Sequence, residues 1–276
     1  MRLGFNFHIQ KGISVTNKFF HTSSKYFTTE IPESSPVFYV LEEAKVTDNF
    51  PLEHDVDLET NNFIGILDLN DILQKPFFYE LKEIKQCTEV TFLKSKYNFE
   101  LICKTLLNDL SAYLTHVGEY DVRDIFTKEP NLLTSTIDKD GKRVGLHIDS
   151  FDMKSIYERD SCRNRICVNL GKEARSILAM NISVREMAKN LELCGVHDLN
   201  PQIGSGIAKM FLRYFPDFPL TMIKLSPGEA YVMPTENLIH DATTIDKKEM
   251  DINLTILGNI RMKRSLMIFK PALNAR

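Results

Sequence analysis

The sequence lacks a long apolar run: no segment reaches the roughly 18 consecutive apolar residues that a membrane-spanning helix needs. Residues 1–8 carry polar side chains where a secretion signal would have its apolar segment, so we expect no export and a cytoplasmic location. The cysteines are few, odd in number and without the spacing of a disulfide framework, which predicts reduced thiols at positions 87, 103, 162, 167 and 194.

Several catalytic and binding motifs are also missing. The chain has no glycine-rich phosphate loop, no Gly-x-Ser-x-Gly nucleophile turn and no Cys-x-x-Cys pair. It has no internal repeat or low-complexity tract, and no charge of one sign dominates, since 34 basic residues face 37 acidic ones. A net charge of −3 argues against a surface that neutralises nucleic-acid phosphates, so we expect neither a nucleic acid nor a membrane as partner.

What is present is the composition of an ordinary globular protein, with 43% hydrophobic and 26% charged residues in 276. We predict one domain, in which an N-terminal mixed region, 1–97, packs on a core formed by 98–276. Short apolar runs at 37–41, 63–69 and 90–93 indicate strands in the first region. Apolar residues that recur at three and four positions predict a helix over 98–120.

Beyond residue 132 the period at which apolar residues recur shortens to the period typical of strands. Ser183 and Glu186 stand at capping-box spacing, so a helical insertion at about 184–216 is expected, broken near Asn200 and Pro201. The predicted strands lie at 133–137, 143–149, 164–170, 176–182, 220–225, 230–233, 252–257 and 266–269. Such a run predicts an α+β chain with a mainly β core, closed or double-sheeted, with the 98–120 helix over one face.

One pair of residues points to metal chemistry. His147 and Asp149 are two apart in a predicted strand, so their side chains project to the same face. A facial triad for Fe(II) needs one further histidine and leaves three coordination positions open. His240 is the best candidate, because it follows a Pro-Gly turn, a strand and a loop that would return the chain to the mouth of the barrel. His54 with Asp57 also has a metal-like spacing, but an acidic loop favours solvated side chains there.

The order strand, His-x-Asp, two strands, turn, strand, His, strand resembles the Fe(II)/2-oxoglutarate-dependent dioxygenases. Their fold is a double-stranded β-helix (jelly-roll, cupin-like), and the resemblance covers about residues 98–269. It implies that His147, Asp149 and His240 bind Fe(II), with 2-oxoglutarate and O₂ as cosubstrates. The implied reaction is hydroxylation of an unactivated C–H bond of a small molecule, such as an amino acid or natural-product intermediate, with release of succinate and CO₂. An Asp at 149 argues against halogenation, because the related halogenases have a small residue there.

The sequence departs from this family where an arginine usually binds the cosubstrate. On the strand after the second histidine stand Asn253 and Thr255, and Arg261 follows only later. Arg165 and Arg175, on the two strands after His-x-Asp, are the other candidates, because a buried arginine needs an anionic partner. The missing arginine leaves open a cupin-like metalloprotein that does not use 2-oxoglutarate. A metal-free jelly-roll binding protein, in which the His-x-Asp spacing is accidental, is the other alternative.

Overall fold

The computed structural model describes residues 6–10, 18–23, 39–40, 63–116, 120–262 and 267–270. The helices are α1 (Pro76–Glu83), α2 (Cys87–Lys96), α3 (Phe99–Leu110), α4 (Val184–Leu193) and α5 (Gly204–Tyr214), with a 3-10 turn at Arg159–Ser161. The strands are β1 (Asn6–Gln10), β2 (Phe19–Ser23), β3 (Tyr39–Val40), β4 (Phe63–Asp68), β5 (Leu114–His116), β6 (Asp121–Lys128), β7 (Asn164–Asn169), β8 (Arg175–Ala179), β9 (Pro219–Leu225), β10 (Glu229–Met233), β11 (His240–Thr243), β12 (Asp251–Gly258), β13 (Ile260–Met262) and β14 (Met267–Lys270).

Two sheets form the centre of the molecule. The large sheet has the strand order β14-β1-β4-β10-β7-β12-β6, and the small sheet has the order β11-β8-β9-β2-β3. A separate two-stranded sheet joins β13 to β5. The described strand pairs are antiparallel except for β1 with β4. The expected β core is therefore present, and it is antiparallel in character.

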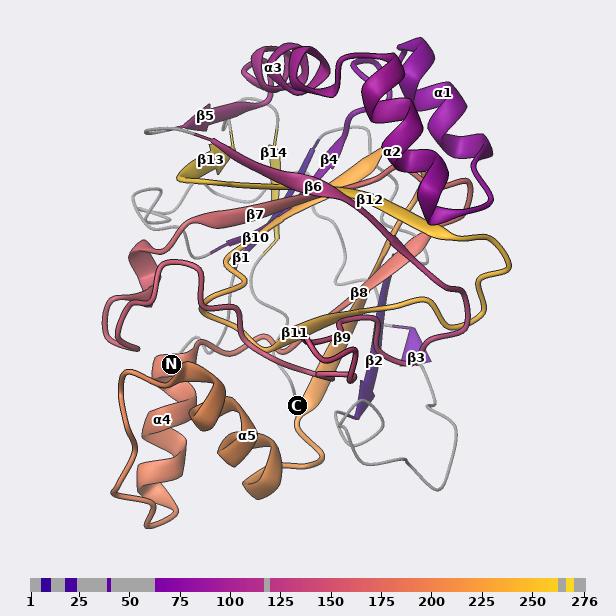
Figure 1. Ribbon diagram of the computed structural model, residues 1–276. Helices are drawn as coiled ribbons and strands as arrows, with labels where there is room; N and C mark the ends of the chain where they lie inside the picture. Colours follow the sequence, from indigo (N-terminus) through magenta and orange to yellow (C-terminus); the bar gives the residue numbers. More distant parts are fainter. Residues whose placement is uncertain are drawn as a thin grey trace.

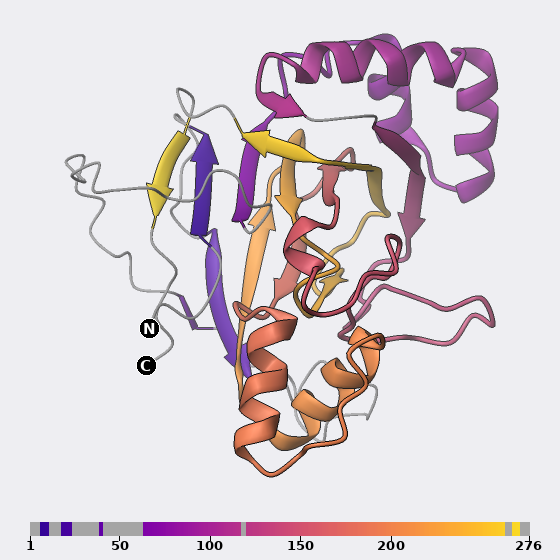
Figure 2. The same cartoon turned by 90° about the vertical axis from the view of Figure 1, so that its left-hand side faces the viewer.

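Helices lie outside both sheets. In Figure 1, α1, α2 and α3 lie across the outer side of the large sheet, whereas α4 and α5 form a hairpin beside the small sheet. Figure 2, turned by 90°, shows the same two helical groups at opposite ends of the molecule. The apolar side chains follow this layering in three clusters. One lies under α1–α3, one under α4 and α5, and one between the sheets.

Alternate side chains of β7 pack into two different apolar clusters. Ile166 and Val168 belong to the cluster under α1–α3, whereas Cys167 belongs to the cluster between the sheets. Successive side chains of a strand point to opposite faces, so every second residue of β7 faces the space between the sheets. Polar residues in that inward register are therefore held close to one another in a buried space.

The helical insertion forms as its sequence predicts. Ser183 caps α4 by accepting a hydrogen bond from the backbone N–H of Glu186. The buried residues of α4 and α5 recur at three and four positions and pack on one another and on the small sheet. Two helices on either side of Asn200 and Pro201 confirm the expected break.

Two predictions for residues 63–120 are wrong. Residues 90–93 form part of α2 rather than a strand. A capping box of Gln86 and Glu89 starts this helix, and Val90 and Leu93 are its buried residues. The predicted helix over 98–120 ends at Leu110. Leu114–His116 pairs instead with β13 as strand β5, so long-range pairing overrides the local pattern there.

The segments before and at the His-x-Asp motif differ from regular strands. Residues 133–137 and 143–149 form isolated bridges only, Ile137 with Arg143 and His147 with His240. They still lie against β11, because Ser135 donates its backbone N–H to the carbonyl of Ala242. The strands expected at 164–170, 176–182, 220–225, 230–233 and 252–257 are confirmed within a few residues. His54, Asp57 and residues 37, 38, 41 and 266 lie outside the described residues.

All five cysteines are free, as expected from their number and spacing. Among the described residues, no helix combines the length and apolar character required to cross a bilayer.

Candidate metal centre

His147 and His240 are brought together by the backbone. His147 donates its N–H to the carbonyl of His240 at 3.0 Å, and His240 returns the bond at 2.8 Å. In such a reciprocal antiparallel pair the two side chains lie on the same face. Their ring centroids are accordingly 4.7 Å apart. The juxtaposition therefore depends on a single bridge between segments more than 90 residues apart in the chain.

Asp149 completes the cluster. Its Oδ1 lies 3.6 Å from Nε2 of His147, and its Oδ2 lies 3.6 Å from Nε2 of His240. One ligand atom from each of the three residues lies within 4.8 Å of the other two. The Asp149 loop is held in place because its backbone N–H donates to the carbonyl of Thr235, in the loop that leads to His240.

The two imidazoles are oriented in the same way. Nδ1 of His147 donates to the carbonyl of Gly145 at 2.8 Å, and Nδ1 of His240 donates to that of Leu238 at 3.3 Å. Since the proton is on Nδ1, the lone pair on Nε2 of each ring points toward the Asp149 carboxylate. Nε2 of His240 is buried with no hydrogen-bond partner among the described residues. Lone pairs that face one another repel, and a cation between them removes that repulsion.

The protonation states of His240 and Asp149 suit a metal. Burial lowers the pKa of His240 to about 3, so its imidazole is neutral. Burial raises the pKa of Asp149, but Arg165 and the two histidines lower it by more, and the net pKa lies well below the usual range. Burial lowers the pKa of His147, yet Asp149 and Asp241 raise it by more. A neutral imidazole and an ionised carboxylate are the forms that bind metals.

Arg165 forms an ion pair with Asp149, one of the three residues of the cluster. Its Nη2 lies 2.8 Å from Oδ2 of Asp149, and its guanidinium stands 5.4 Å from the ring centroid of Phe151. Burial lowers the pKa of Arg165, but Asp149 raises it by more, so the cation is retained. Arg165 therefore fixes the direction of the Asp149 carboxylate, which leaves it less able to bind a separate anion.

A second polar group lies between the sheets, next to the first. Cys167 of β7 stands opposite Tyr231 of β10 and Thr255 of β12. The thiol of Cys167 donates to Oδ1 of Asn253 at 3.3 Å, and Nη1 of Arg175 lies 2.6 Å from its sulfur. Burial raises the pKa of Tyr231 well above its ordinary value, so its hydroxyl keeps its proton and can donate.

The charges in this interior do not cancel. Asp251 lies 3.5 Å from Nε of Arg175 and 3.0 Å from Nζ of Lys247, and all three side chains are at most 5% exposed. Asp251 therefore faces two cations, of which Lys247 also lies close enough to the Glu173 carboxylate to lower the pKa of Glu173. A buried charge without a partner is costly, so a second anion near Arg175 would be stabilised.

The candidate residues from the sequence fall into two groups. His147, Asp149, His240 and Arg165 meet in one cluster, and Arg175, Asn253 and Thr255 meet in the adjoining one. The backbone of Arg261 lies in β13, which pairs with β5 outside both large and small sheets. Tyr231, Lys247 and Asp251 were not predicted, because only strand register brings them to Arg175.

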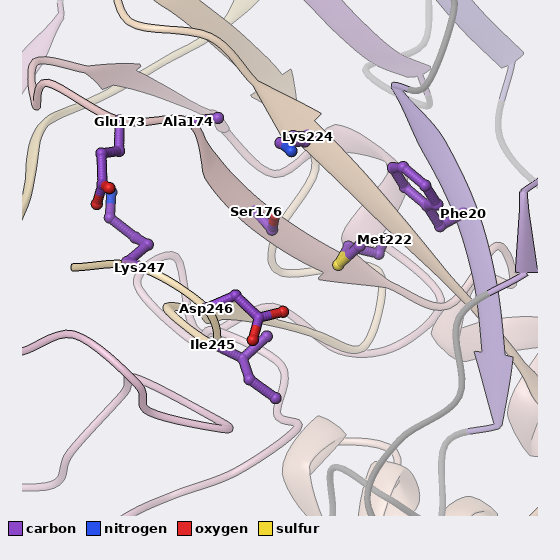
Figure 3. A pocket seen from close by; sticks show the side chains of 9 residues that line it. All are labelled: Phe20, Glu173, Ala174, Ser176, Met222, Lys224, Ile245, Asp246 and Lys247. Atoms are coloured by element: carbon purple, nitrogen blue, oxygen red, sulfur yellow. The ribbon is translucent and has the colours of Figure 1, made fainter. Parts of the chain in front are cut away.

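A cavity of about 380 Å³ lies elsewhere, on the small sheet (Figure 3). Ser176, Met222 and Lys224 line it from β8 and β9, and Phe20 closes one side. Ser176 alternates with Arg175 along β8, so the cavity is on the opposite face of the strand from the inward cluster. It is therefore separate from the His147, Asp149 and His240 group.

Two facing sheets that enclose two imidazoles and one carboxylate define a candidate mononuclear metal centre. No known protein family and no curated protein matches the sequence. Among solved structures, matches include three of one enzyme, described as the Kdo hydroxylase KdoO, a non-heme Fe(II) alphaketoglutarate dependent dioxygenase.

The measured similarities to these structures are low. The apo structure is 12% identical, with a TM-score of 0.39 over 71% of this chain and 79% of that chain. The cobalt(II) complex is 13% identical, with a TM-score of 0.36 over 70% and 69%. The complex with succinate and Fe(III) is 13% identical, with a TM-score of 0.34 over the same shares.

Proposed function

We propose that this chain is an Fe(II)- and 2-oxoglutarate-dependent oxygenase that hydroxylates an unactivated C–H bond of a small molecule. The observation that carries the proposal is the convergence of His147, Asp149 and His240, whose ligand atoms lie within 4.8 Å of one another. Two histidines and one carboxylate with open positions are the donor set of non-haem Fe(II) oxygenases.

The strand order supports a double-stranded β-helix. Along the chain, β6 and β7 belong to the large sheet, β8 and β9 to the small, β10 to the large, β11 to the small and β12 to the large. The segment between β6 and β7 hydrogen-bonds to the edge strand β11 of the small sheet. This wrapping of one chain between two antiparallel sheets supports a jelly-roll. We propose a single domain, 1–276, with this core over 98–276.

The metal fits the donors present. The unpartnered Nε2 of His240 is directed at Oδ2 of Asp149, and Nε2 of His147 at Oδ1. These residues would hold an iron ion, which would supply the chemistry by which O₂ oxidises 2-oxoglutarate to succinate and CO₂, with the second oxygen atom going to the substrate. Arg165 holds Asp149 from the other side, so the carboxylate keeps one orientation toward both histidines.

Arg175 is the proposed partner of the 2-oxoglutarate carboxylate remote from the metal. It is buried, it lies between the sheets, and its side chain shares the carboxylate of Asp251 with Lys247. A planar guanidinium binds a carboxylate in bidentate fashion. The hydroxyls of Tyr231 and Thr255 stand on the facing strands, where they are able to donate further hydrogen bonds.

Two observations favour a second function. Asp251 already lies 3.5 Å from Arg175, and Asn253 replaces the arginine that the resembled family usually has on this strand. Both features favour a cupin-like metalloprotein that binds the metal without 2-oxoglutarate. A cytoplasmic location and a small-molecule substrate, without nucleic acid or membrane as partners, remain part of our proposal.

An anaerobic titration of the full chain with Fe(II) and then 2-oxoglutarate tests these functions. We expect a weak metal-to-ligand charge-transfer band in the visible spectrum. Asp149→Ala should bind Fe(II) at least about 100-fold more weakly, since loss of even an outer-shell partner commonly costs 10- to 100-fold. That variant should show no band.

Arg175→Met separates the two metal-dependent functions. We expect Fe(II) binding as in the wild type but a band that needs a much higher 2-oxoglutarate concentration. Bound iron without any band in the wild type would favour the cupin-like protein. A wild-type chain that binds no iron would contradict both, and would leave the metal-free binding protein.

A further inference from the structure

Arg159 is a buried cation whose two shortest hydrogen bonds go to backbone carbonyls. Its side chain is 1% exposed, and its Nη1 donates to the carbonyl of Asp149 at 3.0 Å and to that of Glu236 at 2.6 Å. Nη2 adds a longer bond, of 3.3 Å, to Oγ of Ser150. Arginine is rarely buried to this extent without a specific partner. The carbonyls of Asp149 and Glu236 are therefore the main hydrogen-bond acceptors of this side chain.

Those two carbonyls belong to the two loops that carry the candidate metal ligands. Asp149 is itself a ligand, and Glu236 stands four residues before His240 in the loop between β10 and β11. Two backbone N–H groups also bond across these loops: that of Asp149 donates to the carbonyl of Thr235, and that of Asp152 donates to the Glu236 carboxylate. A rigid planar guanidinium that bonds both carbonyls from one nitrogen sets the spacing between the loops.

The helical insertion closes over Arg159. Gly204 begins α5, and a Cβ at this position would lie 2.7 Å from Cζ, 2.8 Å from Nη2 and 3.0 Å from Nη1 of Arg159. Such contacts are shorter than a side chain tolerates, so the backbone of α5 rests directly on the guanidinium. The backbone N–H of Ile156, near Arg159, also donates to the carbonyl of Pro201, just before α5.

We infer that Arg159 is a positioning residue for the metal centre, and that the start of α5 at Gly204 holds it in place. This inference rests on the proposed metal binding at His147, Asp149 and His240. The helical insertion that contains α5 then helps to position the metal ligands. A change in α5, which contributes none of the three candidate ligands, should alter how the metal is held.

Gly204→Ala tests this, with Gly206→Ala as the matched control. Both changes replace glycine by alanine in the same helix and so raise helix propensity alike. A Cβ at Gly206 meets only the Ile203 side chain, at 3.3 Å, and none of Arg159. Calorimetric titration of the full apo chain with Co(II) should show binding about 10- to 100-fold weaker in Gly204→Ala. Gly206→Ala should stay within about twofold of the wild type.

Arg159→Lys keeps the inference testable if Gly204→Ala fails to fold. Lysine keeps the charge but lacks the planar fork, so we expect a shifted visible band of bound Co(II) and weaker binding, with more loss in Arg159→Met. Circular dichroism checks that each variant is folded. A wild-type affinity and Co(II) spectrum in Gly204→Ala and Arg159→Lys would overturn the inference.

The same titration separates this inference from the proposed function. If the wild type binds Co(II), Asp149→Ala does not, and the Arg159 and Gly204 variants match the wild type, the metal centre stands and the positioning role falls. If the wild type binds no Co(II), the metal centre itself is overturned, and the inference with it.

Discussion

The cysteine side chains show how strongly burial alone controls reactivity in this chain. Cys103 is packed in helix α3, and burial raises its pKa to about 11. Burial raises the pKa of Cys162 to about 12, and the charges of Glu236 and Asp152 act in the same direction. The thiolate is the reactive form, so both side chains are protonated and inert near neutral pH. Cys87 and Cys194 are exposed and lack this protection.

Alkylation with iodoacetamide at pH 8 should therefore modify Cys87 and Cys194 first. Cys103 and Cys162 should react at least about tenfold more slowly, because a pKa raised by two or more units reduces the thiolate fraction by a larger factor. Mass spectrometry of peptides over time measures the order. Equal labelling of all four in the native chain, matched to that in urea, would contradict this account.

At the level of secondary-structure elements, the turn between β9 and β10 joins the two sheets. Gly228 has a φ of +85°, and its N–H and carbonyl both bond to other segments, to the carbonyl of Asn169 and the N–H of Leu69. A Cβ there would lie 2.1 Å from Oδ1 of Asn70. The turn thus requires glycine for its backbone conformation and for its close packing.

Gly228→Ala should lower the free energy of unfolding by about 3 kcal/mol, from left-handed strain and from displaced hydrogen bonds of Asn70. Gly141→Ala is the control for strain alone, since Gly141 has a φ of +75° but no atom within 4 Å of an added Cβ. That change should cost about 1 kcal/mol. Urea unfolding of both variants measures the difference. Equal losses would show that packing against Asn70 is unimportant.

For the whole molecule, the first strands extend both sheets rather than forming a separate unit. Strand β1 pairs with β4 and β14 in the large sheet, and β2 pairs with β9 and β3 in the small sheet. Lys18, just before β2, forms a buried ion pair with Glu229 at the start of β10. The N-terminal strands therefore pair with both sheets, and the ion pair of Lys18 adds a contact next to the turn between β9 and β10.

Lys18→Met should lower the free energy of unfolding by about 3 kcal/mol, because it leaves the buried carboxylate of Glu229 without its cation. Lys75→Met is the matched control. Lys75 pairs with Asp109 at 2.9 Å, but both side chains are about 30% exposed, so solvent compensates and the loss should stay within about 1 kcal/mol. Similar losses in the two variants would contradict the importance of burial.

The strand and helix patterns could be predicted because they depend on neighbours in the sequence. Ser183 with Glu186 indicates the start of α4, and alternation in β12 and β9 marks strands wherever their pairing partners are. His147 and Asp149 share a face by local spacing alone. The exceptions are α2 and β5, where a glutamine-based capping box and a distant partner strand decided the outcome, and the segments 133–137 and 143–149, which form isolated bridges only.

The sequence by itself thus determined the elements and the ligand types: two histidines and an aspartate in strand-like segments. Only the tertiary structure decided which side chains meet. It paired Arg165 with Asp149, placed Arg175 beside Cys167 and Asp251, and buried Arg159 between the two ligand loops. These contacts depend on strand register and on backbone hydrogen bonds between segments as far as 90 residues apart. No local pattern encodes that register, because it is selected by the burial of all strands together.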